Sequence, residues 1–385
     1  MFAERFKNRL EVQKQAFLYR DTPEIKKKDG KYLFIGGRKV LNFSSNDYLG
    51  LSVSEELKNK VARNFQKYNT SASSSRLVSG NYSVISRAER EYAKHFGYED
   101  ALFFPSGYQA NIGILSTFFE KGDTIIFDKH IHASSVKGMT LSGAVFKGYN
   151  HNSMTHLKKR LDANTRDQVA VLTESLFSMD GDFLDIDAFQ RVKRQYNFLS
   201  IVDEAHAFGA LGEMGRGMAR GVADIAVGTF GKALGLFGAF VLLPKGFKEY
   251  LFNFSSPLIY TTTLPEAHAA SAIDLLKIIS QCEDLRKHLR NVSRMMKEGL
   301  RHEGFRVTGD AHILAIEIGE EDRTVAVARG LLKKDIFALP ARFPTVPIHR
   351  AILRVSMMSL HTEDDVAHFI RTLMEVFNKI GQPGR

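Results

Sequence analysis

The chain has 385 residues, of which 44% are hydrophobic and 25% charged, and its formal net charge is +10. This composition excludes an intrinsically disordered chain, and the length fits two domains, or one large domain with a smaller one attached. The single cysteine, Cys282, excludes an intramolecular disulfide. No run of about 18 apolar residues occurs, so we expect no membrane span.

The first residues and the basic excess bear on location and partners. Residues 1–20 are charged and mixed, without the apolar core of a signal peptide, so we expect a cytoplasmic protein. A basic surface attracts nucleic acid, anionic membranes or phosphorylated small molecules. The densest basic run, at residues 26–28, is short and is expected to be a solvated loop. No basic stripe with interleaved aromatic residues stands beside it, which argues against nucleic acid as a partner.

In chain order, the predicted elements begin with an arm that consists of a helix at residues 2–18 and a β-hairpin at residues 31–42. From about residue 100 to 245, nearly continuous apolar runs alternate with helical patterns, which is typical of strands buried on both faces of a parallel sheet. Helices are expected at 109–119 and 187–196. The expected strands are 101–104, 124–127, 169–173, 199–202, 225–227 and 239–243. This alternation predicts an α/β fold with right-handed crossovers.

The pattern changes towards the carboxyl end. Residues 264–299 have apolar positions at helical spacing, and we expect one long helix there. The remaining elements, two helices and three short strands, predict a smaller α+β domain. They are the strands 305–307, 312–318 and 352–356 and the helices 324–334 and 363–380. We therefore expect three parts: an N-terminal arm at 1–44, a large domain at 45–285 and a small domain at 286–385.

Polar clusters follow five of the expected strands. In an open parallel sheet, ligands bind beyond the carboxyl ends of the strands. Five clusters at one edge therefore predict a shared ligand site. They occupy residues 105–108, 128–132, 174–178, 203–206 and 229–232.

Lys232 and Asp203 indicate the chemistry of that site. A lysine amine can form a Schiff base, and a carboxylate can keep a pyridine nitrogen protonated, which together are what pyridoxal phosphate requires. The alternative is a nucleic-acid-dependent NTPase, because residues 203–206 read Asp-Glu-Ala-His. Such an enzyme needs a phosphate loop with Ser or Thr after its lysine. The two Gly-Lys pairs, at 30–31 and 231–232, lack that residue and the glycine spacing, which disfavours the alternative.

Two weaker patterns lie at the same edge. Gly107 precedes an expected helix, where the backbone can approach an anion. His130 and His132 are two residues apart without a cysteine or a pair of carboxylates nearby, which is a poor zinc pattern. We expect no metal.

Five motifs resemble one family over nearly the whole chain. They are residues 42–50 (Asn-Phe-Ser-Ser-Asn-Asp-Tyr-Leu-Gly), 177–182 (Phe-Ser-Met-Asp-Gly-Asp), 202–206, 229–232, and 344–347 followed by 353–355. These motifs resemble the α-oxoamine synthases, which are pyridoxal-phosphate enzymes of the aspartate-aminotransferase fold (fold type I). The resemblance implies a large cofactor-binding domain with a mostly parallel sheet, a smaller C-terminal α+β domain and a homodimer with shared active sites.

The resemblance also implies roles for four side chains. Lys232 would form the Schiff base with pyridoxal phosphate and then remove the α-proton of the amino acid. Asp203 would pair with the pyridinium nitrogen and raise its pKa. His206 would bond the ring hydroxylate. His132 would stack on the ring and help to polarise the acyl carbonyl.

Other cofactor contacts follow from the same resemblance. Within one subunit, the groups that hold cofactor oxygens would be Ser178, Thr229 and the backbone of Gly107 and Tyr108. The phosphate of the neighbouring subunit would be reached by Thr261 and Thr262.

The substrates implied are L-alanine and a pimeloyl thioester, carried by CoA or a carrier protein, which the biotin-forming branch condenses with loss of carbon dioxide. Arg354 would clamp the amino-acid carboxylate, with Asn46 nearby. Arg342, and Arg20 at the same entrance, would recognise the distal carboxylate of the acyl chain. The alternative within the family is glycine or serine with another acyl-CoA, as in the 2-amino-3-oxobutyrate, 5-aminolevulinate and serine palmitoyltransferase reactions.

Two positions depart from the family pattern and make the choice of branch less specific. They are Ile85, where the family usually has histidine, and Ile352, where it often has arginine.

Overall fold

A computed structural model describes residues 2–166 and 168–381. The chain forms two compact units. Of the described residues, the large unit comprises 51–166, 168–177 and 183–284, and the small unit comprises 2–50, 178–182 and 285–381. The domain limits at 44 and 285 stay a prediction, and the two units are described separately below.

The large unit is built on a seven-stranded sheet in the order β4-β10-β9-β8-β7-β5-β6. Its strands are β4 (Asp100–Phe104), β5 (Thr124–Asp128), β6 (Val145–Tyr149), β7 (Val169–Glu174), β8 (Leu199–Asp203), β9 (Ile225–Thr229) and β10 (Ala239–Leu243). Only β10 runs antiparallel to its neighbours among these seven strands. The carboxyl ends of the other six strands therefore lie at one edge, and the predicted mostly parallel α/β sheet is confirmed.

Strand β6 was absent from the prediction. It is an edge strand, and four of its five residues are at least partly exposed. Lys147 and Gly148 interrupt its apolar pattern. An edge strand with one neighbour needs no continuous apolar run, so the signal that found the central strands was missing here.

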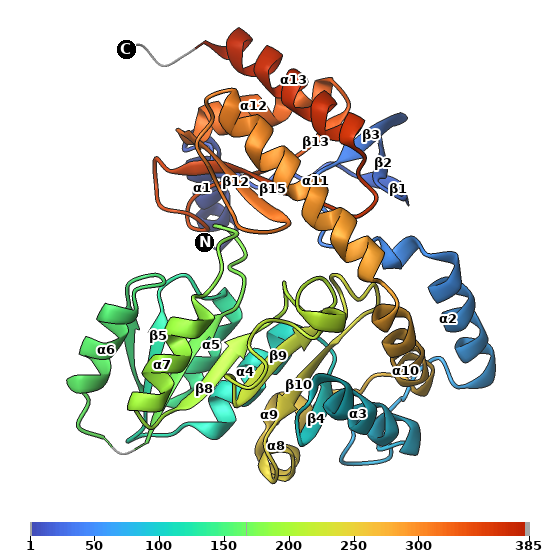
Figure 1. The fold of residues 1–385 in the computed structure, drawn as a ribbon, viewed down its shortest axis with the longest axis vertical. Helices are drawn as coiled ribbons and strands as arrows, with labels where there is room; N and C mark the ends of the chain where they lie inside the picture. Colours follow the sequence, from blue (N-terminus) through green and yellow to red (C-terminus); the bar gives the residue numbers. More distant parts are fainter. Residues whose placement is uncertain (1, 167, 382–385) are drawn as a thin grey trace. The chain divides into compact units, whose positions relative to one another are not determined.

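Side chains of successive sheet residues enter different cores, as the period of a strand requires. Ile125 packs with helices α4 (Gly107–Phe118), α5 (Ala133–Ser142) and α8 (Phe247–Phe254). Its neighbour Ile126 packs on the other face with α6 (Met154–Asp162) and α7 (Ile186–Gln195). Within the large unit, helices lie on both sides of the sheet (Figure 1). Burial on both faces explains why the central strands are almost wholly apolar.

An aromatic cluster fills the β4–β10 end of the second face. Tyr92 of α3 (Ser83–Phe96) meets Phe103 edge-on with ring centroids 5.1 Å apart, and Phe240 lies 5.0 Å from Tyr92. A Cβ on Gly228 of β9 would come within 2.4 Å of the Phe240 ring. Glycine at 228 therefore lets these rings pack against β9, directly before the lysine loop.

The long helix predicted at 264–299 is wrong, because two helices occupy this stretch. They are α10 (Glu266–Ser280), which packs on α2 (Glu55–Lys67), and α11 (Glu283–His302). The break falls at Gln281 and Cys282. Glu283 and Asp284 form an acidic first turn of α11, where carboxylates favour the start of a new helix.

The small unit contains two four-stranded sheets. One has the order β11-β12-β15-β14 and is antiparallel; the other has the order β1-β2-β3-β13. The strands are β1 (Ile25–Asp29), β2 (Tyr32–Ile35), β3 (Arg38–Asn42), β11 (Val307–Thr308), β12 (Ile313–Gly319), β13 (Ile336–Phe337), β14 (Leu339–Ala341) and β15 (Ala351–Ser356). Besides α11, the helices are α1 (Phe2–Gln15), α12 (Glu321–Lys333) and α13 (Glu363–Ile380).

The solvated loop predicted at residues 26–28 is wrong. These three lysines lie in β1, an edge strand that pairs antiparallel with β2. Lys28 Nζ lies 2.7 Å from Asp47 Oδ2 and Lys27 Nζ lies 3.5 Å from Asp29 Oδ2, so two of the three charges form ion pairs within the unit. Lysines on an edge strand also discourage pairing with another chain.

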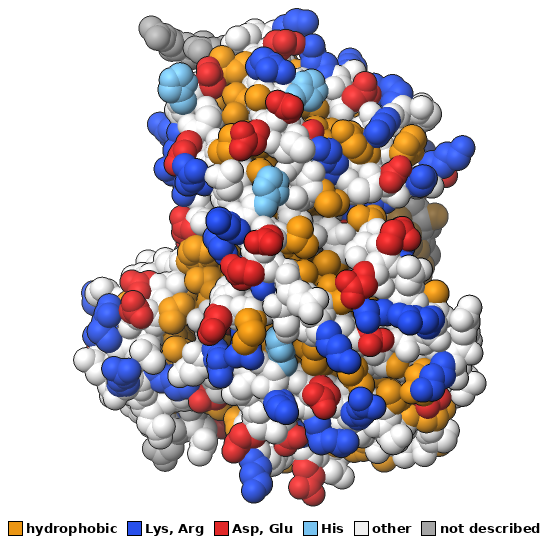
Figure 2. Space-filling model, turned by 45° about the vertical axis from the view of Figure 1, so that its right-hand side comes forward, with side chains coloured by type: hydrophobic (Ala, Val, Ile, Leu, Met, Phe, Trp, Pro, Cys, Tyr) orange, Lys and Arg blue, Asp and Glu red, His pale blue; other side chains and the backbone are white. Residues whose placement is uncertain are grey.

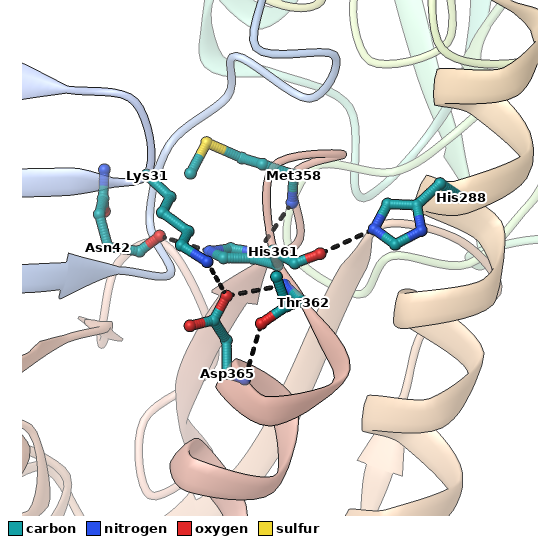
Figure 3. Close-up of polar contacts among 7 residues, drawn as sticks. All are labelled: Lys31, Asn42, His288, Met358, His361, Thr362 and Asp365. Carbon is teal, nitrogen blue, oxygen red and sulfur yellow. Dashed lines mark hydrogen bonds and ion pairs between the residues drawn. The ribbon is translucent and has the colours of Figure 1, made fainter.

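Figure 3 shows a polar network that joins the β1–β2 turn and β3 to helices α11 and α13. His361 is fully buried; its Nδ1 accepts the backbone N–H of Met358 at 3.1 Å, and its Nε2 lies 3.1 Å from the carbonyl oxygen of Asn42. Its own carbonyl accepts His288 Nε2 at 2.8 Å. Burial lowers the pKa of His361 to about 4, so the ring is neutral and carries its proton on Nε2.

An ion pair completes this network. Lys31 Nζ pairs with the carboxylate of Asp365. Asp365 also accepts the backbone N–H of Thr362 at 2.7 Å, and Thr362 Oγ1 accepts the backbone N–H of Asp365 in return. This capping box starts α13, so one carboxylate both caps a helix and anchors the N-terminal hairpin.

The surface view in Figure 2 bears on the excess of basic residues. On the face shown, basic and acidic side chains are interspersed rather than gathered by sign. Among the helices of the described residues, none is both long and apolar enough to cross a membrane.

Candidate active site

The lysine loop connects β9 to β10 within the large unit. Thr229 Oγ1 donates to the carbonyl of Gly238 at 3.0 Å, which closes the base of the loop. Gly235 has φ +67°, and a Cβ there would come within 2.7 Å of the backbone nitrogen of Ser52. Only glycine fits both conditions. Lys232 is thus presented on a short, closed loop at the carboxyl edge of the sheet.

His206 is the partner of Lys232. The two nitrogens, Lys232 Nζ and His206 Nε2, lie 2.8 Å apart. His206 is 7% exposed and follows the end of β8, while Lys232 follows the end of β9. Because β8 and β9 are adjacent and parallel, their loops leave the sheet side by side. The structure therefore brings together the lysine and the imidazole that the sequence placed 26 positions apart.

A buried hydrogen-bond network connects Asp203 to His132. Asp203 Oδ2 accepts from Asn111 Nδ2 at 2.9 Å, and the same nitrogen donates to Ser134 Oγ at 3.0 Å. Ser134 Oγ lies 2.7 Å from His132 Nδ1. Asp203, Asn111 and Ser134 are all buried. Asp203 Oδ1 is also held, by the backbone N–H of Ala205 at 2.9 Å.

The charge around His132 is set by three effects. Removal from water lowers the pKa of the imidazole, the negative charge of Asp203 raises it, and the positive charge of Lys232 lowers it again. The net direction is downward, which favours a neutral ring. His132 also caps helix α5, since its side chain accepts the backbone N–H of Ser134.

Sequence reasoning missed Asn111 and Ser134. The available signal was an amide on helix α4, whose other inward positions, such as Ile114 and Leu115, are apolar. Asn111 stands four residues after Gly107, one turn into that helix. A polar side chain in that position is expected to bond something near the strand ends.

Glu204, the second acid of the Asp-Glu-Ala-His motif, serves the fold. It is buried, and its carboxylate accepts Ser175 Oγ at 2.6 Å and the backbone N–H groups of Met218 and Ala219 at 3.0 and 2.6 Å. Burial raises its pKa, and these hydrogen bonds oppose the rise. The two acids of the motif therefore differ in use: Glu204 ties down residues 217–219, and Asp203 meets Asn111 at the strand end.

Helix α4 begins at the same edge. Ser106 is its N-cap, and Ser106 Oγ accepts the backbone N–H of Gln109 at 3.2 Å. Gly107 and Tyr108 are the first two residues of this 12-residue helix, where N–H groups and the helix dipole favour an anion. A Cβ on Gly107 would lie 3.9 Å from Thr229 Cβ, so the helix start and the lysine loop are neighbours.

The donor set of the large unit fits pyridoxal phosphate. It combines a lysine amine, a buried carboxylate and a helix N-terminus at one sheet edge. These match a carbonyl carbon, a ring nitrogen and a phosphate group respectively. The predicted roles of Lys232, Asp203, His206, His132, Gly107, Tyr108 and Thr229 stay predictions.

In the small unit, Arg354 of β15 is 4% exposed and is held from several sides. Its Nε donates to the carbonyl of Ser178 at 2.7 Å, and its Nη1 donates to Ser356 Oγ at 2.7 Å. Its Nη2 lies 3.4 Å from Asn46 Oδ1, which also accepts the Tyr48 hydroxyl at 3.0 Å. Three residues singled out from the sequence, Asn46, Ser178 and Arg354, thus meet within this unit.

Tyr48 was not among the predicted residues. Burial raises the pKa of its hydroxyl to about 12, although Arg354 opposes the rise, so the hydroxyl stays protonated as a donor. Its ring lies 3.9 Å from the ring of His312, measured between centroids. This packing fixes the hydroxyl that orients Asn46.

Arg342 and Arg20 belong to a different part of the small unit. A cavity of about 550 Å³ is lined by Arg342 and Arg329 together with apolar side chains that include Phe17 and Leu332. Arg342 donates to the carbonyls of Phe17 and Tyr19. Burial lowers the pKa of its guanidinium, and the charges of Arg20 and Arg329 add to this effect. The guanidinium predicted to read the acyl chain therefore also anchors the segment after α1.

The remaining predicted positions lie apart from these clusters. Thr261 and Thr262 follow the short helix α9 (Ser256–Ile259), and their contact with a second subunit stays a prediction. Ile85 is a buried residue of α3, and Ile352 lies in β15 beside Leu353. Ile85 is thus part of the hydrophobic core of the large unit, and Ile352 is part of a strand of the small unit.

Comparisons with known proteins agree with this arrangement. Residues 38–373 match the family Aminotransferase class I and II. The 8-amino-7-oxononanoate synthase of Geotalea daltonii is 37% identical, and the match covers 98% of this chain and 99% of that protein. The structure of a serine palmitoyltransferase from S. paucimobilis with a bound PLP–myriocin aldimine has a TM-score of 0.91 at 25% identity, covering 98% and 97% of the two chains. The crystal structure of 8-amino-7-oxononanoate synthase from Francisella tularensis has a TM-score of 0.76 at 31% identity, covering 88% and 97%.

The chain therefore belongs to the class I and II aminotransferase family of pyridoxal-phosphate enzymes, and within it to the α-oxoamine synthases. Enzymes of this class act on an amino acid and an acyl thioester. The predicted family, fold type and cofactor class are confirmed, in place of the NTPase alternative. In sequence, the chain is similar to 8-amino-7-oxononanoate synthases over nearly its full length.

Proposed function

We propose that this protein condenses L-alanine with a pimeloyl thioester, with loss of carbon dioxide, to give 8-amino-7-oxononanoate for biotin synthesis. The observation that carries the proposal is the pairing of Lys232 with His206, 2.8 Å apart, at the sheet edge that also holds Asp203. It stands in a chain that is 37% identical to an 8-amino-7-oxononanoate synthase over 98% of its length.

In the proposed reaction, pyridoxal phosphate supplies an electron sink for the α-carbon of the amino acid. Lys232 Nζ takes the α-proton of alanine, and His206 positions that nitrogen. A carbon–carbon bond would form to the thioester carbonyl as its carbon–sulfur bond breaks, and the thiolate would leave and take a proton from water. The carboxyl group of alanine would then leave as carbon dioxide, and the α-carbon would take back the proton held by Lys232.

Charged side chains, hydroxyl groups and backbone N–H groups would support this chemistry. The Asp203 carboxylate favours a protonated ring nitrogen, since an opposite charge stabilises the cation. The first turn of α4 would hold the phosphate through the backbone of Gly107 and Tyr108, and Thr229 and Ser178 would bond cofactor oxygens. Arg354 would bind the alanine carboxylate with Asn46 beside it.

The second substrate would be read by cations. Arg342 lines the cavity of the small unit, and the positive charge of Arg20 lowers the pKa of the Arg342 guanidinium. We propose that they bind the distal carboxylate of the pimeloyl group. We further propose a homodimer in which Thr261 and Thr262 reach the phosphate held by the partner subunit. The cytoplasmic location stays a prediction.

A second candidate is the condensation of serine or glycine with another acyl-CoA. The TM-score of 0.91 with a serine palmitoyltransferase favours it, against 0.76 for the 8-amino-7-oxononanoate synthase of Francisella tularensis. A panel of alanine, glycine and serine against pimeloyl-CoA, acetyl-CoA, succinyl-CoA and palmitoyl-CoA separates the two. Highest kcat/KM with alanine and pimeloyl-CoA supports the proposal; highest kcat/KM with any other pair overturns it.

A further inference from the structure

The hydrogen bonds around Ser134 determine which nitrogen of His132 carries the proton. Ser134 Oγ lies 2.7 Å from His132 Nδ1, and the backbone N–H of Ser134 also points at Nδ1, at 3.3 Å. A backbone N–H can only donate. If Nδ1 carried a hydrogen, two donors would face each other at this point, so Nδ1 must be the acceptor.

Asn111 reinforces this assignment. Its Nδ2 lies 2.9 Å from Asp203 Oδ2 and 3.0 Å from Ser134 Oγ. The opposite orientation of the amide would press its oxygen against the Asp203 carboxylate, so the nitrogen takes this place and gives one hydrogen to each oxygen. Ser134 Oγ then accepts from Asn111, and its single hydrogen is left to point at His132 Nδ1.

We propose that Asn111 and Ser134 are positioning residues that hold His132 as the neutral tautomer with its hydrogen on Nε2. The buried carboxylate of Asp203 fixes the amide of Asn111, the amide fixes the hydroxyl of Ser134, and the hydroxyl fixes the imidazole. His132 is thereby a hydrogen-bond donor through Nε2, without adding a second positive charge beside Lys232.

The charged groups that act on His132 come from two elements. Asp203 at the end of β8 favours protonation of the ring, and Lys232 in the loop after β9 opposes it. Helices α4 and α5 contribute the uncharged groups of Asn111 and Ser134. The hydroxyl bond stabilises only the form in which Nδ1 is bare, so its loss should raise the pKa of the ring.

The assignment of the proton is independent of the reaction, whereas its use in catalysis rests on the proposed function. In the proposed condensation, a neutral donor can polarise the acyl carbonyl and return unchanged after the thiol leaves. Loss of the tautomer should then lower kcat and leave KM for alanine nearly unchanged.

The test is nitrogen NMR of the full-length protein with labelled histidine, recorded without substrates. The resonances of His132 are identified by their loss in His132→Gln. The wild-type spectrum should show a bare Nδ1 and a protonated Nε2. In Ser134→Ala, the tautomers should mix and the pKa of His132 should rise by about 0.4–1 unit, the shift expected from one neutral hydrogen bond. Asn111→Ala should shift both readouts in the same direction.

Two variants serve as controls. Ser142→Ala removes a buried hydroxyl from the same helix, but that hydroxyl donates to the carbonyl of Met139, and both His132 readouts should stay at wild-type values. Ser134→Thr keeps a hydroxyl and should restore the wild-type tautomer.

Three results would overturn the proposal. They are a protonated Nδ1 in the wild-type protein, a Ser134→Ala spectrum that matches wild type, and equal shifts in Ser134→Ala and Ser142→Ala. The wild-type spectrum decides the assignment even where a variant does not fold. A correct tautomer in a protein that fails to condense alanine with pimeloyl-CoA would reject the proposed function and leave this assignment intact.

Discussion

Two hydrogen-bond networks in this protein each contain a histidine, which is buried in one network and exposed in the other, and they use it in opposite ways. His361 in the small unit has both ring nitrogens bonded to backbone groups, and burial lowers its pKa to about 4 (Figure 3). His132 in the large unit is bonded through Nδ1 and lies near the charges of Asp203 and Lys232. The first ring has no capacity left for a ligand, and the second keeps Nε2 for one.

The comparison teaches how one side chain can serve stability or chemistry. Burial lowers the pKa of His361 to about 4, and partial removal from water lowers the pKa of His132 although its side chain is exposed. His361 is closed off by the carbonyl of Asn42 and by stacking on Phe43, with ring centroids 4.3 Å apart. His132 caps a helix at the carboxyl edge of the sheet, where ligands of α/β proteins bind. Variants in the network of His361 should change the free energy of unfolding, and variants in the network of His132 should change kcat.

The largest effect is expected for Lys232→Ala. Loss of the covalent link and of the base should lower kcat at least about 10³-fold while the fold survives. Turnover and the thermal midpoint are measured together. Lys129→Ala, which removes a lysine bonded to Asn150, is the control and should keep its activity. Borohydride reduction followed by peptide mapping should find the cofactor on Lys232, and a label on another lysine contradicts the assignment.

Asp203→Asn should lower kcat by roughly 10²–10³-fold, because it removes the charge that keeps the ring nitrogen protonated. Cofactor affinity should change much less, since the phosphate contacts persist. Glu204→Gln is the contrasting variant in the same motif. It should lower the thermal midpoint instead, because the Glu204 carboxylate bonds Ser175 and two backbone N–H groups. A wild-type rate of α-proton exchange on alanine in Asp203→Asn would rule out the charge effect.

His361 should make stability depend on pH. Its pKa is about 4 in the folded protein and about 6.5 when unfolded. Between these two pH values the unfolded chain therefore binds more protons than the folded protein. The contribution of His361 to the free energy of unfolding is complete above pH 6.5 and is lost as the pH falls towards 4. The loss should be about 3 kcal/mol.

The measurement is the free energy of unfolding in urea at several pH values for wild type and His361→Gln. Their difference isolates His361 from His268, whose pKa burial also lowers to about 4. The variant should be less stable at pH 7 and should lose less stability on acidification. His302→Gln, at an exposed position, should follow the wild-type curve. Parallel curves for His361→Gln and wild type would contradict the assigned role.

The smallest effects are expected for the two arginines. Arg354→Ala should raise KM for alanine about 10- to 100-fold, the effect of losing charge-assisted hydrogen bonds. Arg342→Ala should raise KM for pimeloyl-CoA by about the same factor and leave alanine unaffected. It should also lose discrimination against an acyl-CoA of equal length without the distal carboxylate. An unchanged preference would mean that Arg342 only anchors Phe17 and Tyr19.

The amino-acid pattern was enough to predict the central sheet, because strands buried on both faces must be apolar along their whole length. It also placed Asp203 and Lys232 at one edge, since the ends of adjacent parallel strands coincide. It missed the edge strand β6, whose apolar run is broken by Lys147 and Gly148, and it joined α10 to α11 across Gln281 and Cys282, where the apolar spacing happens to continue.

Which polar groups bond each other could be seen only in the folded protein. Nothing in the local pattern shows that Asn111 of α4 reaches both Ser134 of α5 and Asp203 of β8. These contacts join residues 23 and 92 positions apart, and they depend on how two helices pack on the sheet. Periodicity reports which face of an element is buried. The partner of each buried polar atom is set by packing, because most buried polar atoms of a folded protein form hydrogen bonds with whatever group the fold places beside them.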